Sequence, residues 1–149
     1  MSVPVLEALA DAIYNEEGNR PPDRAYRNRN PGNLRPTDPS QPHDDGNYRV
    51  FATFEEGYSA LLHDLLCKVT GHNVHSLNQT STLYNFAEVW APSSDHQRLC
   101  LPNVPLTYAQ GLAAWMGKAL GVVIESSSSF VFIFNAAGQD YPVYVEPAA

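Results

Sequence analysis

The chain has 149 residues and a formal net charge of −7 at pH 7. Its hydrophobic fraction of 44% and its length are typical of one soluble globular domain with a hydrophobic core. The acidic balance argues against nucleic acid as a partner, and no apolar run is long enough for a membrane span. The first residues lack the basic and apolar segments of a secretory signal, so we expect either no signal or one that has been removed.

Apolar residues at helical spacing between positions 3 and 17 predict a first amphipathic helix. On a helical wheel, Glu16 lies roughly 35° and Glu17 roughly 65° from the centre of the apolar stripe, so both carboxyls point toward protein. Gly18 ends this helix. A carboxyl that is partly desolvated there keeps its proton near neutral pH and suits acid catalysis, although a solvated helix end is the commoner explanation of an acidic pair.

Residues 18–47 are rich in Pro, Asn, Asp and Arg, and such a long irregular segment is more often functional or disordered than a plain connector. Six of the nine basic residues lie between positions 20 and 49, against four acidic residues. Pairing of these arginines with nearby acids is the simplest explanation, and a rim that attracts an anionic polymer is the alternative. Residues 48–51 are typical of a short strand, which we expect to pair with residues near Leu34.

Three further helices are predicted from apolar residues at helical spacing, and they span residues 53–71, 81–90 and 107–121. Capping boxes open two of them, formed by Thr53 with Glu56 and by Thr107 with Gln110.

Two apolar runs near the C-terminus, residues 130–134 and 141–145, flank a turn and predict a β-hairpin with Pro142 on an edge strand. Such a run needs a covering surface, which is either the helical body, a second copy of the chain or a larger assembly. We therefore expect a mainly α (α+β) fold in which residues 1–123 form the main domain. Residues 124–149 are expected to form a hairpin tail, packed on that domain or on a partner.

No metal and no cofactor is expected. Cys67 and Cys100 are the only cysteines, and their spacing predicts no metal ligation and leaves a disulfide open. The histidines at 72 and 75, with His63 nearby, lack a partner motif elsewhere, so exposed loop histidines are the simpler interpretation.

Glu17-Gly18 at the end of the first helix and residues 27–35 (Arg-Asn-Arg-Asn-Pro-Gly-Asn-Leu-Arg) together resemble the phage-type muramidases and lytic transglycosylases of the lysozyme-like superfamily. The likeness continues through residues 48–61, 90–92 and 108–122, in the order that the family has. The resemblance implies a lysozyme-like helical domain over residues 1–123, with a cleft that binds peptidoglycan.

In that family the glutamate that closes the first helix is the catalytic acid, which corresponds to Glu17 because glycine follows it directly; the helical wheel slightly favours Glu16. The resemblance implies that a transglycosylase uses one such residue first as acid and then as base, while the substrate's N-acetyl group stabilises the sugar cation and the muramoyl 6-hydroxyl closes an anhydro ring. A hydrolytic muramidase would instead admit water, with Asp38, Asp44 or Asp45 as a candidate second carboxylate. We prefer the single-acid mechanism, because loop aspartates usually form turns.

Five residues are candidates for substrate binding around the acid: Asn30, Asn33, Tyr84, Trp90 and Tyr108. The two asparagines can contact acetamido or hydroxyl groups, or can simply stabilise the turn. Tyr108 resembles a cleft tyrosine that orients the acid or the acetamido group, and a core aromatic is the equal alternative. Tyr84 and Trp90 can stack on sugar faces, although Trp90 also lies on an apolar helical stripe.

Two functions are therefore expected. The first is a lytic transglycosylase or muramidase that cleaves the MurNAc-GlcNAc β-1,4 bond of peptidoglycan glycan strands, acting in the periplasm or cell wall or as part of a phage or secretion particle. The second is a non-catalytic structural or peptidoglycan-binding protein on the same fold, which self-associates or joins an assembly through the apolar hairpin. The loop at 37–47 and the hairpin tail depart from the family's pattern, and either can alter the cleft.

Overall fold

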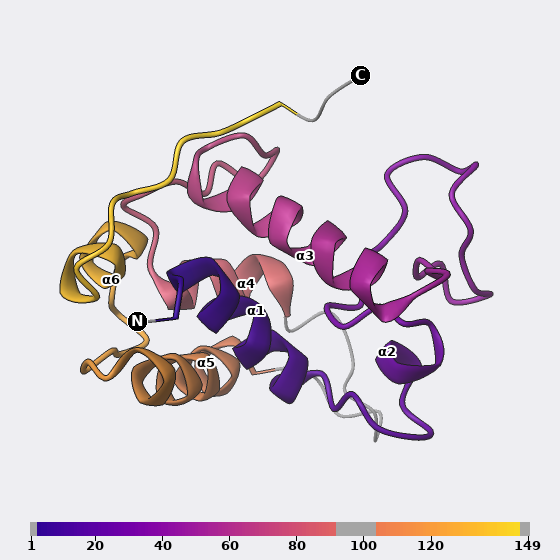
Figure 1. Cartoon of the computed structure of the whole chain (residues 1–149), viewed down its shortest axis with the longest axis horizontal. Coiled ribbons are helices and arrows are strands. Elements are labelled where there is room, and N and C mark those ends of the chain that lie inside the picture. Colours follow the sequence, from indigo (N-terminus) through magenta and orange to yellow (C-terminus); the bar gives the residue numbers. More distant parts are fainter. Residues whose placement is uncertain (1–2, 92–103, 147–149) are drawn as a thin grey trace.

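The computed structural model describes residues 3–91 and 104–146. Within these ranges the only strand pairing consists of isolated bridges, and the mainly α class is confirmed. The helices are α1 (Val5–Glu16), α2 (Arg24–Arg27), α3 (Phe54–Val69), α4 (Leu83–Trp90), α5 (Pro105–Leu120) and α6 (Phe130–Ala136) (Figure 1). None of these helices has both the length and the apolar character that a bilayer crossing requires.

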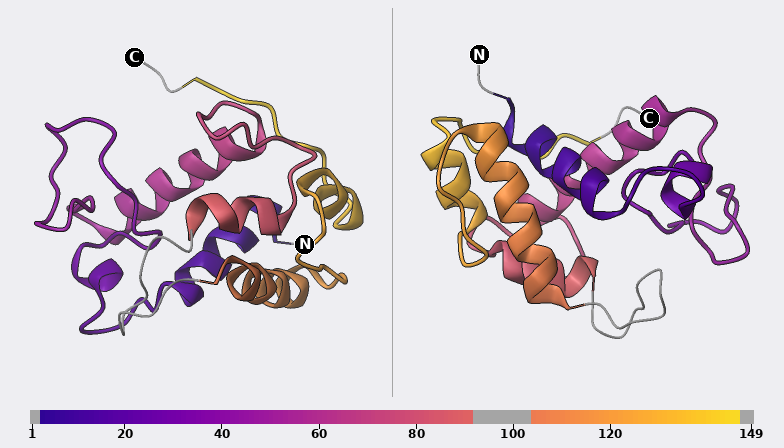
Figure 2. Two further views of the ribbon diagram at one scale, coloured as in Figure 1. Left: turned by 180° about the vertical axis from the view of Figure 1, so that it is seen from behind. Right: turned by 90° about the horizontal axis from the view of Figure 1, so that it is seen from below.

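The core is built around α1, which packs against α5 on one side and α3 on the other (Figure 1). Leu9 and Ile13 of α1 are fully buried, as their four-residue spacing on one helical face predicts. They join buried residues of the three longest neighbouring helices, including Leu61, Leu65, Phe86, Leu112 and Met116. Residues 18–53 lie at the opposite end of the molecule from α6 in all three views (Figure 2).

The helix starts differ in part from the predicted caps. Thr53 caps α3, because its hydroxyl accepts a hydrogen bond from the Glu56 amide at 3.2 Å, but the return bond from the Glu56 side chain that would complete the predicted capping box is not found among the described residues. The capping box predicted at Thr107–Gln110 is wrong, since α5 begins two residues earlier, at Pro105. Proline suits the first position of a helix because it has no amide hydrogen to leave unsatisfied there.

The predicted C-terminal β-hairpin is wrong: residues 130–134 belong to helix α6. Ser129 caps this helix, and its hydroxyl accepts a hydrogen bond from the Phe132 amide at 3.2 Å. Phe132 itself is 50% exposed. The buried residues have helical spacing and are Phe130, Ile133 and Phe134. An unbroken run of five apolar residues has no period of its own, so the serine before it is the informative signal.

Helix α6 completes the core of the helical body. The Phe130 ring lies edge-on against Phe86 at 6.1 Å, and the Tyr141 ring packs against Phe134 at 4.8 Å. Between residues 137 and 146 the chain runs without a helix or strand past the C-terminal end of α3, where the Tyr141 hydroxyl donates to the Val69 carbonyl (Figure 1). The chain's own core therefore covers most of the first apolar run and Tyr141 of the second, whereas Val143 and Val145 are 80% and 67% exposed.

The short β element predicted at residues 48–51 is reduced to one antiparallel bridge, between His43 and Arg49. The Arg49 amide also donates to the Leu34 carbonyl at 2.9 Å, so the expected pairing near Leu34 consists of a single hydrogen bond. Side chains rather than a strand ladder hold the loop.

Candidate functional site

Glu17 follows the last residue of α1 and keeps a helical hydrogen bond, from its amide to the Ile13 carbonyl at 2.8 Å. Gly18 then turns the chain with a φ of +67°, a conformation that favours glycine. A Cβ at Gly18 would also lie 2.7 Å from a carboxylate oxygen of Asp23. The local sequence thus ends the helix immediately after Glu17.

Three side chains from three parts of the chain hydrogen-bond the Glu17 carboxyl. The Tyr108 hydroxyl donates to Oε1 at 3.3 Å, and the Asn33 Nδ2 donates to Oε2 at 3.3 Å. The Trp90 side chain makes a further hydrogen bond to the same carboxyl. Three of the five predicted substrate-binding residues therefore meet at the predicted acid.

Desolvation raises the pKa of Glu17 from its ordinary value of 4.5 to about 7. The hydrogen bonds from Asn33, Trp90 and Tyr108 lower this pKa, because they stabilise the charged form, and they oppose desolvation only in part. Part of the Glu17 residue remains exposed to solvent. The carboxyl can therefore both hold a proton near neutral pH and exchange it.

The Glu16 carboxyl, which the helical wheel slightly favours as the acid, lies in a different environment from that of Glu17. The residue is exposed, and its carboxylate packs against α5 at Gly111, where a Cβ would lie 2.1 Å from Oε1. Burial raises the pKa of Glu16 too, but no hydrogen bond to its carboxyl is found among the described residues. Of the two neighbouring carboxyls, that of Glu17 is therefore the one that side chains from other parts of the chain hold by hydrogen bonds.

Asn33 offers an acceptor as well as a donor beside the acid. Its backbone has a positive φ of 50°, which asparagine tolerates better than most residues. Its Oδ1 is buried and has no hydrogen-bond partner within residues 3–91 and 104–146. A buried acceptor of this kind is costly unless something donates to it, so an N–H or O–H of a ligand suits this position.

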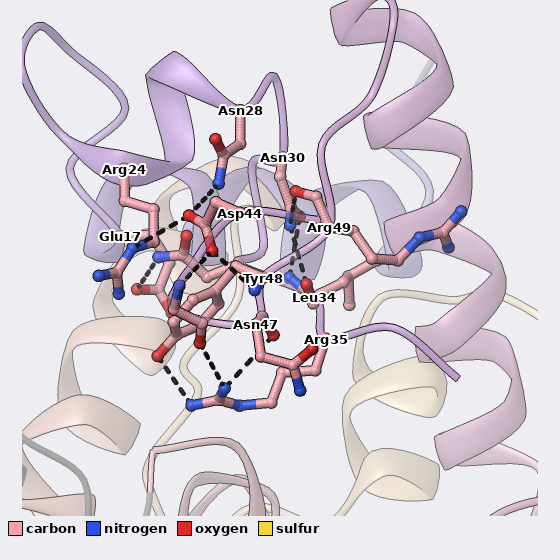
Figure 3. Close-up of polar contacts among 12 residues, drawn as sticks. Glu17, Arg24, Asn28, Asn30, Leu34, Arg35, Asp44, Asn47, Tyr48 and Arg49 are labelled. Atoms are coloured by element: carbon pink, nitrogen blue, oxygen red, sulfur yellow. Dashed lines mark hydrogen bonds and ion pairs between the residues drawn. The ribbon is translucent and has the colours of Figure 1, made fainter. Parts of the chain in front are cut away.

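Asn30 is fully buried, and its side chain holds the turn (Figure 3). Its Nδ2 donates to the carbonyls of Leu34 at 2.9 Å and Arg49 at 3.0 Å, and its Oδ1 accepts from the Leu34 amide at 2.8 Å. These contacts fit the structural interpretation that the sequence left open for Asn30. These hydrogen bonds fix the turn that begins at Asn30, and they thereby set the position of Asn33.

The two aromatic candidates on α4 lie at its two ends. Tyr84 is exposed in the first turn, and no contact with Glu17 is found among the described residues. The Trp90 ring stacks on Phe86 at 5.2 Å, and the Lys68 ammonium lies 5.3 Å from its centroid. Trp90 therefore combines a partly buried ring with a polar contact to the acid, which the sequence did not predict.

A polar network that the sequence analysis missed organises the arginine-rich loop (Figure 3). The Tyr48 ring lies between the guanidinium groups of Arg24 at 4.3 Å and Arg35 at 4.1 Å. Asp44 accepts from Asn28 at 2.9 Å and from the Tyr48 amide at 3.0 Å, and it forms an ion pair with Arg24 at 3.5 Å. Desolvation alone would raise the pKa of Asp44, but these contacts outweigh it and lower the pKa. Asp44 is thus used as an anchor of the loop.

Metal-ligating side chains do not cluster in the part of the chain that the structure describes: no group of three or more His, Cys, Asp or Glu residues there could hold an ion. The Cys67 sulfur lies 3.6 Å from Nε2 of His63 on α3. Cys100, the other half of any disulfide, lies outside the described residues.

Comparisons of the chain with protein-family models, with curated proteins and with solved structures yield no match. The function must therefore be argued from the geometry at Glu17. A carboxyl with a pKa of about 7, held by donors and beside a vacant acceptor, has the arrangement of a general acid and base for a polar, uncharged substrate.

Proposed function

We propose that the protein cleaves the MurNAc-GlcNAc β-1,4 bond of peptidoglycan, with Glu17 as the single general acid and base. The observation that carries the proposal is the Glu17 carboxyl, whose pKa is about 7 and which Tyr108, Asn33 and Trp90 hold in place. Glycoside cleavage needs such an acid, because the leaving oxygen must be protonated as the bond breaks. The resemblance to lysozyme-like muramidases and lytic transglycosylases supports the choice of substrate.

In the first step, protonated Glu17 gives its proton to the glycosidic oxygen, and the bond from the MurNAc C1 to that oxygen breaks. The N-acetyl group of the substrate stabilises the positive charge that develops at C1. Asn33 Oδ1 is available to accept a hydrogen bond from the acetamido N–H. The donors from Tyr108 and Asn33 stabilise the carboxylate that the proton transfer leaves on Glu17.

In the second step, the Glu17 carboxylate takes the proton of the MurNAc 6-hydroxyl as that oxygen bonds to C1. The products are a 1,6-anhydro end and a free GlcNAc hydroxyl, and no water is consumed. We favour this step over hydrolysis with a second carboxylate, because Asp38 and Asp44 both accept hydrogen bonds from backbone amides within their own turns. The protein would act on the wall from the periplasm or from a phage or secretion particle.

The test is loss of turbidity of purified cell walls with the wild type, with Glu17→Gln and with the matched control Glu16→Gln. We expect Glu17→Gln to lose at least about a hundredfold in rate, as removal of a general acid does. Glu16→Gln should keep most of the activity, and mass spectra of the products should show anhydro ends. Equal rates for the wild type and Glu17→Gln would overturn the proposal, and loss only in Glu16→Gln would move the acid to its neighbour.

The non-catalytic alternative was favoured by an apolar tail that needed a partner. The tail instead contributes Phe130, Ile133 and Phe134 to the chain's own core. This burial weakens the argument for the alternative, although Val143 and Val145 of the second apolar run stay exposed. The alternative becomes the conclusion if intact, folded protein cleaves no cell wall.

A further inference from the structure

A pocket of about 580 Å³ lies between the end of α1, helix α2 and the start of α3. Tyr14 and Asn19, which line it, flank Glu17 in the sequence, so the pocket adjoins the segment that carries the acid. Its other large side chains come from α2, the residues after it and the first turn of α3: Tyr26, Arg27, Arg29 and Phe54. Its volume is in the range of pockets that bind small molecules or short peptides.

The charge of the pocket is positive in a chain whose net charge is −7. Arg27 and Arg29 are both exposed, and no carboxylate is among the lining residues. Within the residues that the structure describes, neither guanidinium forms an ion pair, whereas Arg24 of the same segment pairs with Asp44. Two unpaired guanidinium groups at one pocket suit a carboxylate, which arginine binds through two parallel hydrogen bonds.

Aromatic rings form the rest of the wall. The Tyr14 and Phe54 rings pack edge to face at 5.9 Å. Tyr26 and Phe54 are 52% and 42% exposed. Rings that are fixed yet accessible offer apolar contact to a ligand that also carries the charge, such as a peptide.

The backbone around the pocket is held in place. Arg29 has a positive φ of 52°, and its carbonyl packs so closely on Gly57 of α3 that a Cβ there would lie 2.0 Å from the oxygen. Asn19 Nδ2 donates to the carbonyls of Tyr14 at 3.0 Å and Pro31 at 3.1 Å. This asparagine therefore ties the pocket to the turn that ends in Asn33, which contacts Glu17.

We infer that this pocket binds the carboxylate-bearing peptide attached to MurNAc in the glycan strand. The inference rests on the proposed function, because that function makes peptidoglycan the polymer at Glu17. The sugar backbone of peptidoglycan is uncharged, and its carboxylates belong to the peptides. The pocket therefore recognises the part of the substrate that the acid does not touch, and it selects strands that carry peptides.

The test measures binding by calorimetry with protein that keeps Glu17, because the disaccharide ligands lack the MurNAc-GlcNAc bond that Glu17 is proposed to cleave. The ligands are a disaccharide-peptide from digested wall and the same disaccharide after amidase has removed the peptide and the lactyl carboxyl that this frees has been converted to an amide. We expect the peptide to tighten binding about tenfold, and Arg27→Gln and Arg29→Gln each to abolish most of that gain. The control is Arg20→Gln, an exposed arginine of the same segment that does not line the pocket. Circular dichroism checks that each variant is folded.

Equal affinity for the two ligands would overturn the inference, as would an equal loss in Arg20→Gln. The protein could instead bind a soluble phosphate polymer more tightly than the disaccharide-peptide, and lose that binding in Arg27→Gln and Arg29→Gln. This result would also overturn the inference, in favour of a phosphate site. Failure of the proposed function is distinguishable: wild-type protein would then cleave no wall, whatever the binding experiment shows. If the protein cleaved strands with and without peptides at equal rates, this result would contradict the inference about the pocket and leave the proposed function standing.

Discussion

The hydroxyl of Tyr108 donates a hydrogen bond to the carboxyl of Glu17 at 3.3 Å, although 91 residues separate them in the chain. The contact joins the first turns of α5 to the end of α1, the two helices that pack most extensively on each other. Desolvation and the charge of Glu17 both raise the pKa of Tyr108, so the phenol stays protonated and remains a donor. The packing of α1 on α5 thereby sets the environment of the proposed acid.

The pH dependence of cleavage tests this environment. The acid must be protonated, so we expect the rate to fall as pH rises through a pKa of about 7. The bond from Tyr108 lowers the pKa of Glu17, because it stabilises the carboxylate. Tyr108→Phe should therefore move the falling limb to higher pH, in addition to any loss in maximal rate. The measurement is the initial rate of turbidity loss at pH values on both sides of neutrality.

A suitable control for this shift is Tyr84→Phe, because Tyr84 is exposed on α4 and no contact with Glu17 is found in the described residues. Its pH profile should match that of the wild type. If the falling limb of the pH-rate profile moved to lower pH in Tyr108→Phe, this result would contradict the role given to the hydrogen bond from Tyr108 to Glu17.

Glu17 should also make stability depend on pH. Its folded-state pKa of about 7 lies above its ordinary value of 4.5, so the native state binds the proton more tightly than the unfolded state does. Stability is then highest below the unfolded pKa and falls as pH rises between the two values. The shift corresponds to about 3 kcal/mol at most, and partial exposure reduces this to roughly 1–3 kcal/mol.

Glu17→Gln removes this penalty, so the variant should unfold at higher urea concentration than the wild type at pH 8. The two proteins should converge near pH 4. Glu16→Gln should follow the wild type more closely, because Glu16 is more exposed than Glu17. A Glu17→Gln protein that is no more stable than the wild type at pH 8 would show that the carboxyl is not desolvated.

Asn30 should be important for stability rather than for chemistry. Asn30→Ala removes three hydrogen bonds and leaves buried groups of Leu34 and Arg49 without their partner. We expect a loss of about 2–4 kcal/mol in the free energy of unfolding, measured with urea. Asn15→Ala, on the exposed side of α1, is the control and should change stability by less than about 1 kcal/mol. Similar values for the two variants would contradict the structural role of Asn30.

The sequence predicted the four longer helices because each repeats its apolar residues at helical spacing, as Leu9 and Ile13 do in α1. It also pointed to Glu17, Asn33 and Tyr108 through the resemblance, and the structure brings these three side chains together. The contact of the Trp90 side chain with Glu17 could not be predicted, because it depends on where the folded chain places the end of α4 relative to the end of α1. The Arg24-Tyr48-Arg35 stack is likewise a product of the folded loop, which no local period describes.

The helical conformation of α6 can be tested with two phenylalanines that the hairpin prediction treats alike. In a strand, Phe130 and Phe132 would point to the same face. In α6, Phe130 is 1% exposed and Phe132 is 50% exposed. Phe130→Ala should therefore destabilise the protein by about 3–5 kcal/mol through loss of core packing, and Phe132→Ala by less than about 1 kcal/mol. Urea unfolding measures both, and comparable losses in the two variants would favour the strand over the helix.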